Sequence, residues 1–144
     1  MTHFVFEIQK WEPSYTLSVA DRRDRDGPYH ETVLIELETA CVLPKKLAGK
    51  KVTIDVFGKR NAFDSASHLH DPMWNARWMG LLDMLRSEGA FYTSMPHDSL
   101  PLLLASLAHG LFRYVLLWGP ALSRGKSFCT SIEWKRSVDL EEGF

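Results

Sequence analysis

The residues best suited to chemistry are two histidines and an aspartate in one polar stretch, His68, His70 and Asp71. Neutral imidazoles two residues apart, with a carboxylate beside them, can hold Zn²⁺ from a loop if a further ligand is supplied. The candidates for that ligand elsewhere in the chain are His97, Asp98 and His109. This set supports a small metal-dependent enzyme as one alternative, although a His-x-His in a polar loop is more often simply solvated.

Two basic clusters have the charge to bind an anion. The first contains Lys45, Lys46 and Lys50, and the second contains Arg124 and Lys126. If both loops lie at one edge of the folded sheet, they form a positive patch for an anionic ligand or nucleic acid. The formal net charge of the whole chain is −1, which argues against nucleic acid as the partner. A solvated rim is the simpler interpretation.

One segment imitates a phosphate-binding loop but has the wrong spacing. Five residues separate Gly119 from Gly125, whereas that loop needs four so that its backbone N–H groups converge on the phosphates. A helix should follow the loop, but residues 128–134 have the pattern of a strand. No nucleophile elbow and no cysteine motif is present either. The sequence therefore assigns no catalytic residue.

The cysteines and the apolar runs bear on the compartment. Cys41 and Cys129 lie far apart in apolar runs, where a free cysteine usually behaves as a small buried hydrophobe. The N-terminus shows no secretory signal, and the longest apolar stretches are too short to cross a bilayer. We therefore expect a cytoplasmic protein with reduced thiols and without a membrane span.

The elements that must position these residues are mostly short β-strands. Residues 4–8 and 15–19 are rich in aromatic and β-branched side chains, which predicts two strands separated by a break at residues 11–14. Residues 32–43 alternate, so that Ile35 and Leu37 share one face while Glu36 and Glu38 share the other. Further strands are predicted at residues 51–57, 112–118 and 127–135.

Residues 73–86 allow two interpretations. Trp74, Trp78 and Leu81 fit a helical stripe. Alternatively, residues 80–85 and 90–95 form two strands joined by a short loop that contains glycine. We favour the hairpin because both of its arms contain residues typical of strands.

A single amphipathic helix is predicted at about residues 98–109. Asp98 can cap its first turn, Pro101 lies where a missing N–H costs nothing, and Gly110 can end it. Leucines recur at the helical spacing of a stripe that faces the core. Leu102 falls on the opposite side of this helix and would be left outside the core.

Size and composition complete the fold prediction. The chain has 144 residues, of which 45% are hydrophobic and 24% charged, as in ordinary globular domains. We expect a single domain, residues 1–144, of the mainly β (α+β) class. Its antiparallel sheet of about seven or eight strands would form a sandwich or an open barrel, with the one helix packed over it.

Two apolar surfaces outside the expected core indicate a protein contact. Leu102 marks the first, and Leu34 marks the second on the outer face of the strand at residues 32–43. The expected function is therefore a non-catalytic binding or assembly module that forms a homo-oligomer, with a homodimer as the simplest case, or binds a protein partner. No cofactor is evident, and zinc enters only with the metal-dependent enzyme.

Overall fold

The computed structural model describes residues 1–19, 29–59 and 79–140. These residues form eight strands, one α-helix and two short 3₁₀ turns. The strands are β1 Thr2–Val19, β2 Tyr29–Leu43, β3 Lys51–Lys59, β4 Gly80–Asp83, β5 Gly89–Pro96, β6 Tyr114–Gly119, β7 Lys126–Cys129 and β8 Ser131–Lys135. The helix is α2 Leu100–Ala108, and the turns are η1 Lys45–Leu47 and η2 His97–Ser99.

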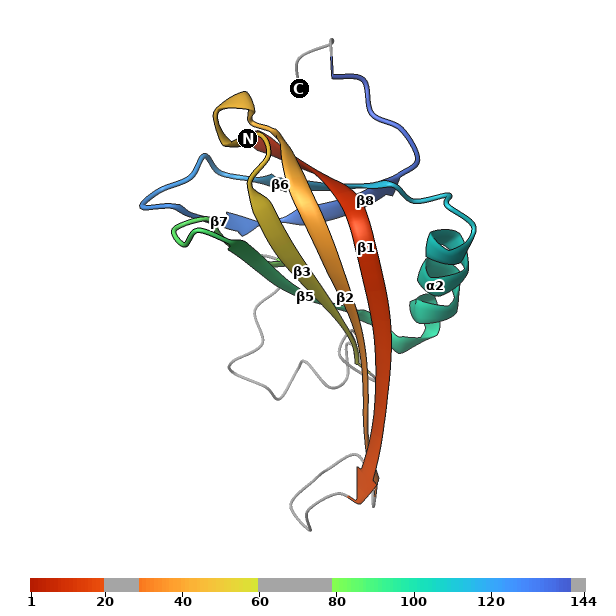
Figure 1. Ribbon diagram of the computed structural model, residues 1–144. Helices are drawn as coiled ribbons and strands as arrows, with labels where there is room; N and C mark the ends of the chain where they lie inside the picture. Colours follow the sequence, from red (N-terminus) through yellow and green to blue (C-terminus); the bar gives the residue numbers. More distant parts are fainter. Residues whose placement is uncertain (20–28, 60–78, 141–144) are drawn as a thin grey trace.

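All eight strands belong to one curled sheet (Figure 1), in the order β7-β4-β5-β3-β2-β1-β6-β8. Its neighbouring strands are antiparallel except β3 and β5, which run parallel. The two ends of the sheet, β7 and β8, are consecutive in the chain and are separated only by Thr130. The sheet must therefore curl until its ends approach each other. The expected mainly β, largely antiparallel fold is confirmed, as an open curled sheet, and the described residues contain one α-helix.

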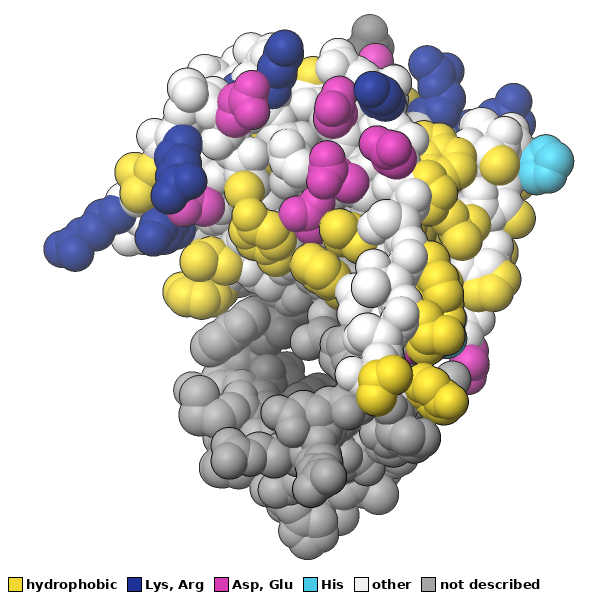
Figure 2. All heavy atoms as spheres, turned by 60° about the horizontal axis from the view of Figure 1, so that its bottom comes forward, with side chains coloured by type: hydrophobic (Ala, Val, Ile, Leu, Met, Phe, Trp, Pro, Cys, Tyr) yellow, Lys and Arg dark blue, Asp and Glu magenta, His cyan; other side chains and the backbone are white. Residues whose placement is uncertain are grey.

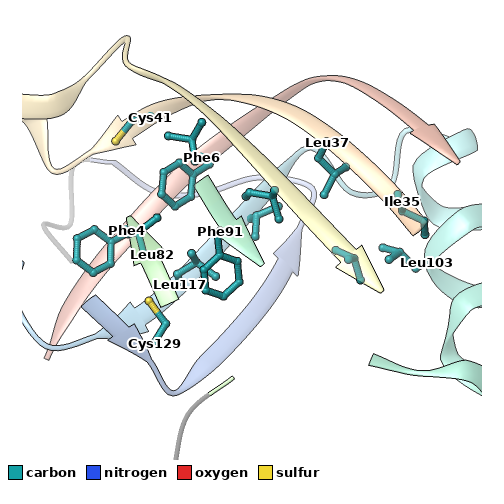
Figure 3. Packing of buried hydrophobic residues seen from close by; sticks show 14 of the residues in the cluster. Phe4, Phe6, Ile35, Leu37, Cys41, Leu82, Phe91, Leu103, Leu117 and Cys129 are labelled. Carbon is teal, nitrogen blue, oxygen red and sulfur yellow. The ribbon is translucent and has the colours of Figure 1, made fainter. Parts of the chain in front are cut away.

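The core fills the inside of this curl. Phe4 and Phe6 from β1, Phe91 from β5 and Leu117 from β6 are fully or almost fully buried there, and Figure 3 shows them gathered in one space. These strands come from both halves of the sheet, so burial of their apolar area holds the curl closed. The predicted hairpin at residues 80–95 is confirmed, because β4 and β5 pair antiparallel.

The helix covers the inner face of the sheet beyond the aromatic core. Leu100, Leu103 and Leu107 are buried, as the leucine stripe predicts, and Figure 3 places Leu103 beside Ile35 of β2. The predicted helix is confirmed, but Asp98 does not cap it. Asp98 lies in η2, and the helix begins at Leu100 without a side-chain cap. Pro101 sits in the first turn as expected, since the missing N–H has no intrahelical acceptor there.

The N-terminal region departs most from the sequence prediction. Instead of two strands with a break at residues 11–14, β1 is one strand of 18 residues that runs through Pro13. A register shift between Ile8 and Lys10 bends the strand. Proline is tolerated within a strand when its nitrogen faces away from the neighbouring strand, at the edge of a sheet. The Ile8 N–H still donates to the Arg113 carbonyl oxygen beside β6, and beyond Ile8 no described strand pairs with β1 on this side.

The last predicted strand, residues 127–135, is also different in the structure. It divides at Thr130 into β7, which pairs with β4, and β8, which pairs with β6. The Thr130 N–H donates to the Trp118 carbonyl oxygen at 2.8 Å, which fixes the turn between the two strands. Periodicity alone does not reveal such a division, because both halves keep the alternation of a strand.

Candidate functional site

The hairpin of β1 and β2 projects beyond the rest of the sheet (Figure 1). The last described residue pair between β2 and β3 at this end joins Val33 to Gly58, so among the described strands β2 pairs only with β1 from Thr32 to Tyr29. Four residues of β1, Thr16–Val19, pair with this part of β2. We call the two-stranded part, residues 16–19 and 29–32, together with the adjoining Tyr15, the arm.

The inner face of the arm carries an exposed apolar row. Residue alternation places Tyr15, Leu17 and Val19 on the same face of β1, and Tyr15 and Val19 lie opposite Val33 and Tyr29 of β2. Val33 packs against the core and Ile35 lies in it, so this face continues the buried face of the sheet. Yet the exposed fractions are 59% for Tyr15, 57% for Leu17, 80% for Val19 and 62% for Tyr29. The row presents on the order of 400 Å² of apolar surface, a size at which surface patches are often functional.

A polar cluster anchors the base of the arm to the turn before the helix. The Tyr15 hydroxyl donates to Glu31 Oε2 at 2.7 Å, and His97 Nε2 of η2 lies 3.1 Å from Glu31 Oε1. The contact between Glu31 and His97 is an ion pair when the imidazole is protonated. Glu31 thus connects β1, β2 and η2 at the point where the arm leaves the sheet. Sequence reasoning named His97 only as a possible metal ligand, and the structure pairs it with a single carboxylate.

Among the described strands, β1 pairs along the arm with β2 alone. The Cys41 N–H donates to Lys50 O on the β3 side of β2. Since N–H groups alternate along a strand, Val33 and Ile35 also direct theirs toward β3. On β1, Tyr15 pairs with Val33 and Pro13 pairs with Ile35. Because the Val33 and Ile35 N–H groups point toward β3, neither pair exchanges hydrogen bonds between β1 and β2. The backbone groups of Tyr15 and Pro13 point away from β2, toward a side where the described chain supplies no strand.

The outer face of the sheet holds a row of acidic residues. Glu12 of β1 lies opposite Glu36 of β2, which lies opposite Asp55 of β3. Asp55 Oδ1 is buried and accepts no hydrogen bond. Burial raises the pKa of the Asp55 carboxyl above its ordinary value, and the negative charge of Glu36 raises it further. Figure 2 shows acidic side chains lying together on one face, with hydrophobic side chains beside them.

The two predicted basic loops do approach the same turn of the structure. The Lys50 ammonium donates to the carbonyl oxygen of Met84, and the Met84 N–H donates to the Gly125 carbonyl at 2.8 Å. Met84 therefore connects the loop that carries Lys45, Lys46 and Lys50 with the loop that carries Arg124 and Lys126. Lys45, Lys46, Arg124 and Lys126 are all exposed. The positive patch was predicted for the case in which both loops lie at one edge of the sheet, and it stays a prediction.

The proposed metal ligands His68, His70 and Asp71 lie outside the described residues, so the zinc site stays a prediction. Within residues 1–19, 29–59 and 79–140, no group of three or more His, Cys, Asp or Glu side chains could hold a metal ion. Cys41 and Cys129 are buried and free, as expected, and burial raises the pKa of each thiol to about 11. They are therefore poor nucleophiles at neutral pH.

The two predicted interface residues differ in exposure. Leu102 is 69% exposed on α2, whereas Leu34 is half-buried on the outer face, opposite Phe57 of β3. Neither lies in the apolar row of the arm, which sequence reasoning missed. The alternation of Tyr15, Leu17 and Val19 resembles that of any half-buried strand. Only the exposures in the folded structure distinguish these side chains from those of a half-buried strand.

Comparison with known proteins found no similar protein. Neither protein-family models, nor curated proteins, nor solved structures gave a match to the chain. In the part of the chain that the structure describes, no helix has the length and apolar character needed to cross a bilayer.

Proposed function

We propose that the protein is a non-catalytic assembly module that associates with itself through the arm. The observation that carries this proposal is the exposed row Tyr15, Leu17, Val19 and Tyr29, which continues the buried face of the sheet. Apolar side chains gain free energy when they leave water, at roughly 25 cal/mol per Å². The row is therefore a surface that association would stabilise.

The arm has a second feature that favours association. A ribbon of two strands is marginally stable at best when nothing packs on it. The arm is held by the pairing of β1 with β2 and by the contacts of Glu31, and the side chains of its apolar row are exposed. A surface of this kind is typical of elements that become fully structured only in an assembly.

Leu17→Glu is expected to convert a dimer at micromolar concentration into a monomer. The substitution places a charge in the middle of the apolar row, where burial of an unpaired carboxylate is strongly unfavourable. The molecular mass of the untagged protein, measured by native mass spectrometry and by light scattering after gel filtration, checks the result.

Thr16→Glu is the matched control for Leu17→Glu. Thr16 is the adjacent residue of β1, is exposed, and points to the opposite face of the arm. This variant is expected to remain a dimer. A wild-type protein that is monomeric at these concentrations, or equal loss of the dimer in both variants, would contradict the proposal.

A second candidate function, anion binding, is favoured by the contacts that connect Lys50, Met84 and Gly125. A labelled single-stranded oligonucleotide is a suitable probe, because its affinity falls with salt in proportion to the phosphates neutralised. Replacing both Arg124 and Lys126 by Gln is expected to reduce the slope of log K against log salt by about 1.4. Lys10→Gln, on the outer face of β1, is the control. Unchanged slopes in all three proteins would exclude this patch.

A further inference from the structure

We infer that the outer face of the sheet docks a segment of another protein in which arginine side chains adjoin an apolar side chain. The docking surface is one row of residues that crosses five strands, and we call it the mixed row: Glu12, Glu36, Asp55, Tyr92 and Leu81. It lies on the face opposite the apolar row of the arm. The inference therefore goes beyond the proposed self-association and does not rest on it.

The register of the sheet places the five residues of the mixed row side by side. Glu12 lies opposite Glu36, which lies opposite Asp55. The row continues from Asp55 to Tyr92 of β5 and from Tyr92 to Leu81 of β4. Neighbouring strands are about 4.8 Å apart, so the row runs roughly 20 Å along the sheet. It has a carboxylate end on β1, β2 and β3 and an apolar end on β5 and β4.

The apolar end presents an exposed aromatic ring. The Tyr92 side chain is 59% exposed, and Leu81 is half-buried beside it. Leu81 in turn lies opposite Phe128 of β7, which is 47% exposed. Figure 2 shows acidic side chains gathered on one face with hydrophobic side chains beside them. An aromatic ring contributes a large contact area, and its electron-rich face attracts a cation.

The carboxylate end has negative charge that the described residues leave uncompensated. In the part of the chain that the structure describes, none of the three carboxylates forms an ion pair. The neighbouring row of the outer face differs, because Glu38 there lies opposite Lys10 and Asp83 lies opposite Lys126. Like charges directly opposite each other destabilise a sheet. A cation bound at the carboxylate end relieves this repulsion, so the free surface is complementary to a positively charged partner.

The order of the residues selects arginine as that cation. Asp55 lies between Glu36 and Tyr92 in the mixed row. A guanidinium centred there lies within reach of two carboxylates and one ring. Its planar fork of N–H donors matches carboxylates, and its plane stacks on an aromatic ring. Lysine offers a point charge without the fork.

The length of the mixed row selects a protein segment over a small cation. A free guanidinium or a polyamine accounts for the carboxylate end only. An apolar side chain in the same segment, placed beyond the arginine, covers Tyr92 and Leu81 and gains free energy by leaving water. An occupant that carries both kinds of side chain therefore fits the whole row.

The test uses a dye-labelled peptide in which three arginines alternate with glycine and a tryptophan follows. Fluorescence anisotropy measures its Kd. Asp55→Asn is expected to weaken the Kd about tenfold, because a hydrogen bond to a charged group is lost. Tyr92→Ala is expected to weaken it about threefold, the effect of an exposed cation–π contact. Glu38→Gln is the matched control, since it neutralises a carboxylate outside the mixed row, and is expected to leave the Kd unchanged.

Folding stability separates a binding role from a structural one. Asp55→Asn removes the repulsion from Glu36 across the β2–β3 pair, so the free variant should have a Tm at or above that of the wild type. A substitution that merely damaged the sheet would lower the Tm and the affinity together. Thermal unfolding without peptide is therefore measured for every variant.

Two results together support the docking surface: binding of the arginine peptide that both Asp55→Asn and Tyr92→Ala weaken, and no binding of the same peptide with glutamate in place of arginine. No binding by the wild type up to about 1 mM peptide overturns the inference. Equal affinity of the wild type and Asp55→Asn also overturns it. Equal binding of a peptide without tryptophan, together with full competition by spermine, would identify a small polycation as the occupant instead. A dimer that both variants lose would identify a second copy of the chain.

Discussion

Phe91→Ala is expected to lower the free energy of unfolding by about 3–5 kcal/mol. Phe91 is fully buried on the inner face of β5, at 0% exposure, among side chains from β1, β4 and β6 (Figure 3). Alanine at this position loses the apolar contacts and leaves a cavity that the surrounding strands can only partly fill. The Phe91 ring packs between the two halves of the curled sheet. We therefore also expect the substitution to destabilise both halves together, so that the variant unfolds in one cooperative transition.

Urea unfolding followed by circular dichroism measures this effect, with protein concentration held constant because association adds to the apparent stability. Tyr92→Ala is the matched control. Tyr92 is the next residue of β5, but it points to the outer face and is 59% exposed. Its replacement is expected to cost about 0.5 kcal/mol. Similar losses at both positions would show that the core does not lie on the Phe91 face of β5.

Asp55→Asn is expected to raise the free energy of unfolding by about 1 kcal/mol at neutral pH. The carboxylate faces Glu36 across the β2–β3 pair, and Glu36 in turn faces Glu12. Oδ1 of Asp55 is buried without a hydrogen bond. Like charges directly opposite each other destabilise a sheet, and a desolvated charge adds to that cost. The amide keeps the shape of the side chain and removes the charge.

The stabilisation by Asp55→Asn should depend on pH in a defined direction. The pKa of the Asp55 carboxyl in the folded protein is raised above the ordinary value of 3.8 by burial and by Glu36. Between those two pKa values the folded state binds more protons than the unfolded chain, so the stability of the wild type falls as pH rises through this window. The advantage of the variant is therefore full above the raised pKa and disappears as pH approaches 3.8.

Glu38→Gln is the control for this prediction. Glu38 lies on the same outer face of β2 but is exposed and faces Lys10 of β1. Its neutralisation is expected to produce no gain, since it removes a favourable neighbour rather than a repulsive one. Urea unfolding of the three proteins from pH 4 to pH 8 distinguishes the cases. A gain for Asp55→Asn that persists unchanged at acidic pH would show that charge is not its cause.

Local patterns in the sequence predicted most of the individual elements. The alternation of Ile35 and Leu37 with Glu36 and Glu38 assigned the two faces of β2, and burial of the first pair and exposure of the second confirm it. The leucine stripe located α2, and the loop with glycine at residue 89 located the hairpin of β4 and β5. These signals succeed because a side chain on a strand or helix is placed by its own period.

The candidate site was less accessible to sequence reasoning. Pro13 was interpreted as a break because proline has no N–H to donate to a neighbouring strand. Its nitrogen faces away from β2, so the proline removes no hydrogen bond between β1 and β2. Likewise, nothing in residues 127–135 indicates that Thr130 sends its two flanking strands to opposite ends of the sheet. Both features depend on which strands are neighbours, and residues close in sequence carry little information about that.

The sequence by itself therefore determined the class of this protein: a mainly β chain with an amphipathic helix after residue 98, apolar inward faces and free, buried cysteines. Tertiary structure alone decided the features on which the proposed function rests. Tyr15, Leu17 and Val19 have the pattern of core residues, and only the tertiary structure shows that they are exposed. The three carboxylates Glu12, Glu36 and Asp55 meet only through the register of three strands. Burial and register are properties of the neighbours that a strand acquires, so the pairing of distant segments creates both the exposed apolar row and the acidic row.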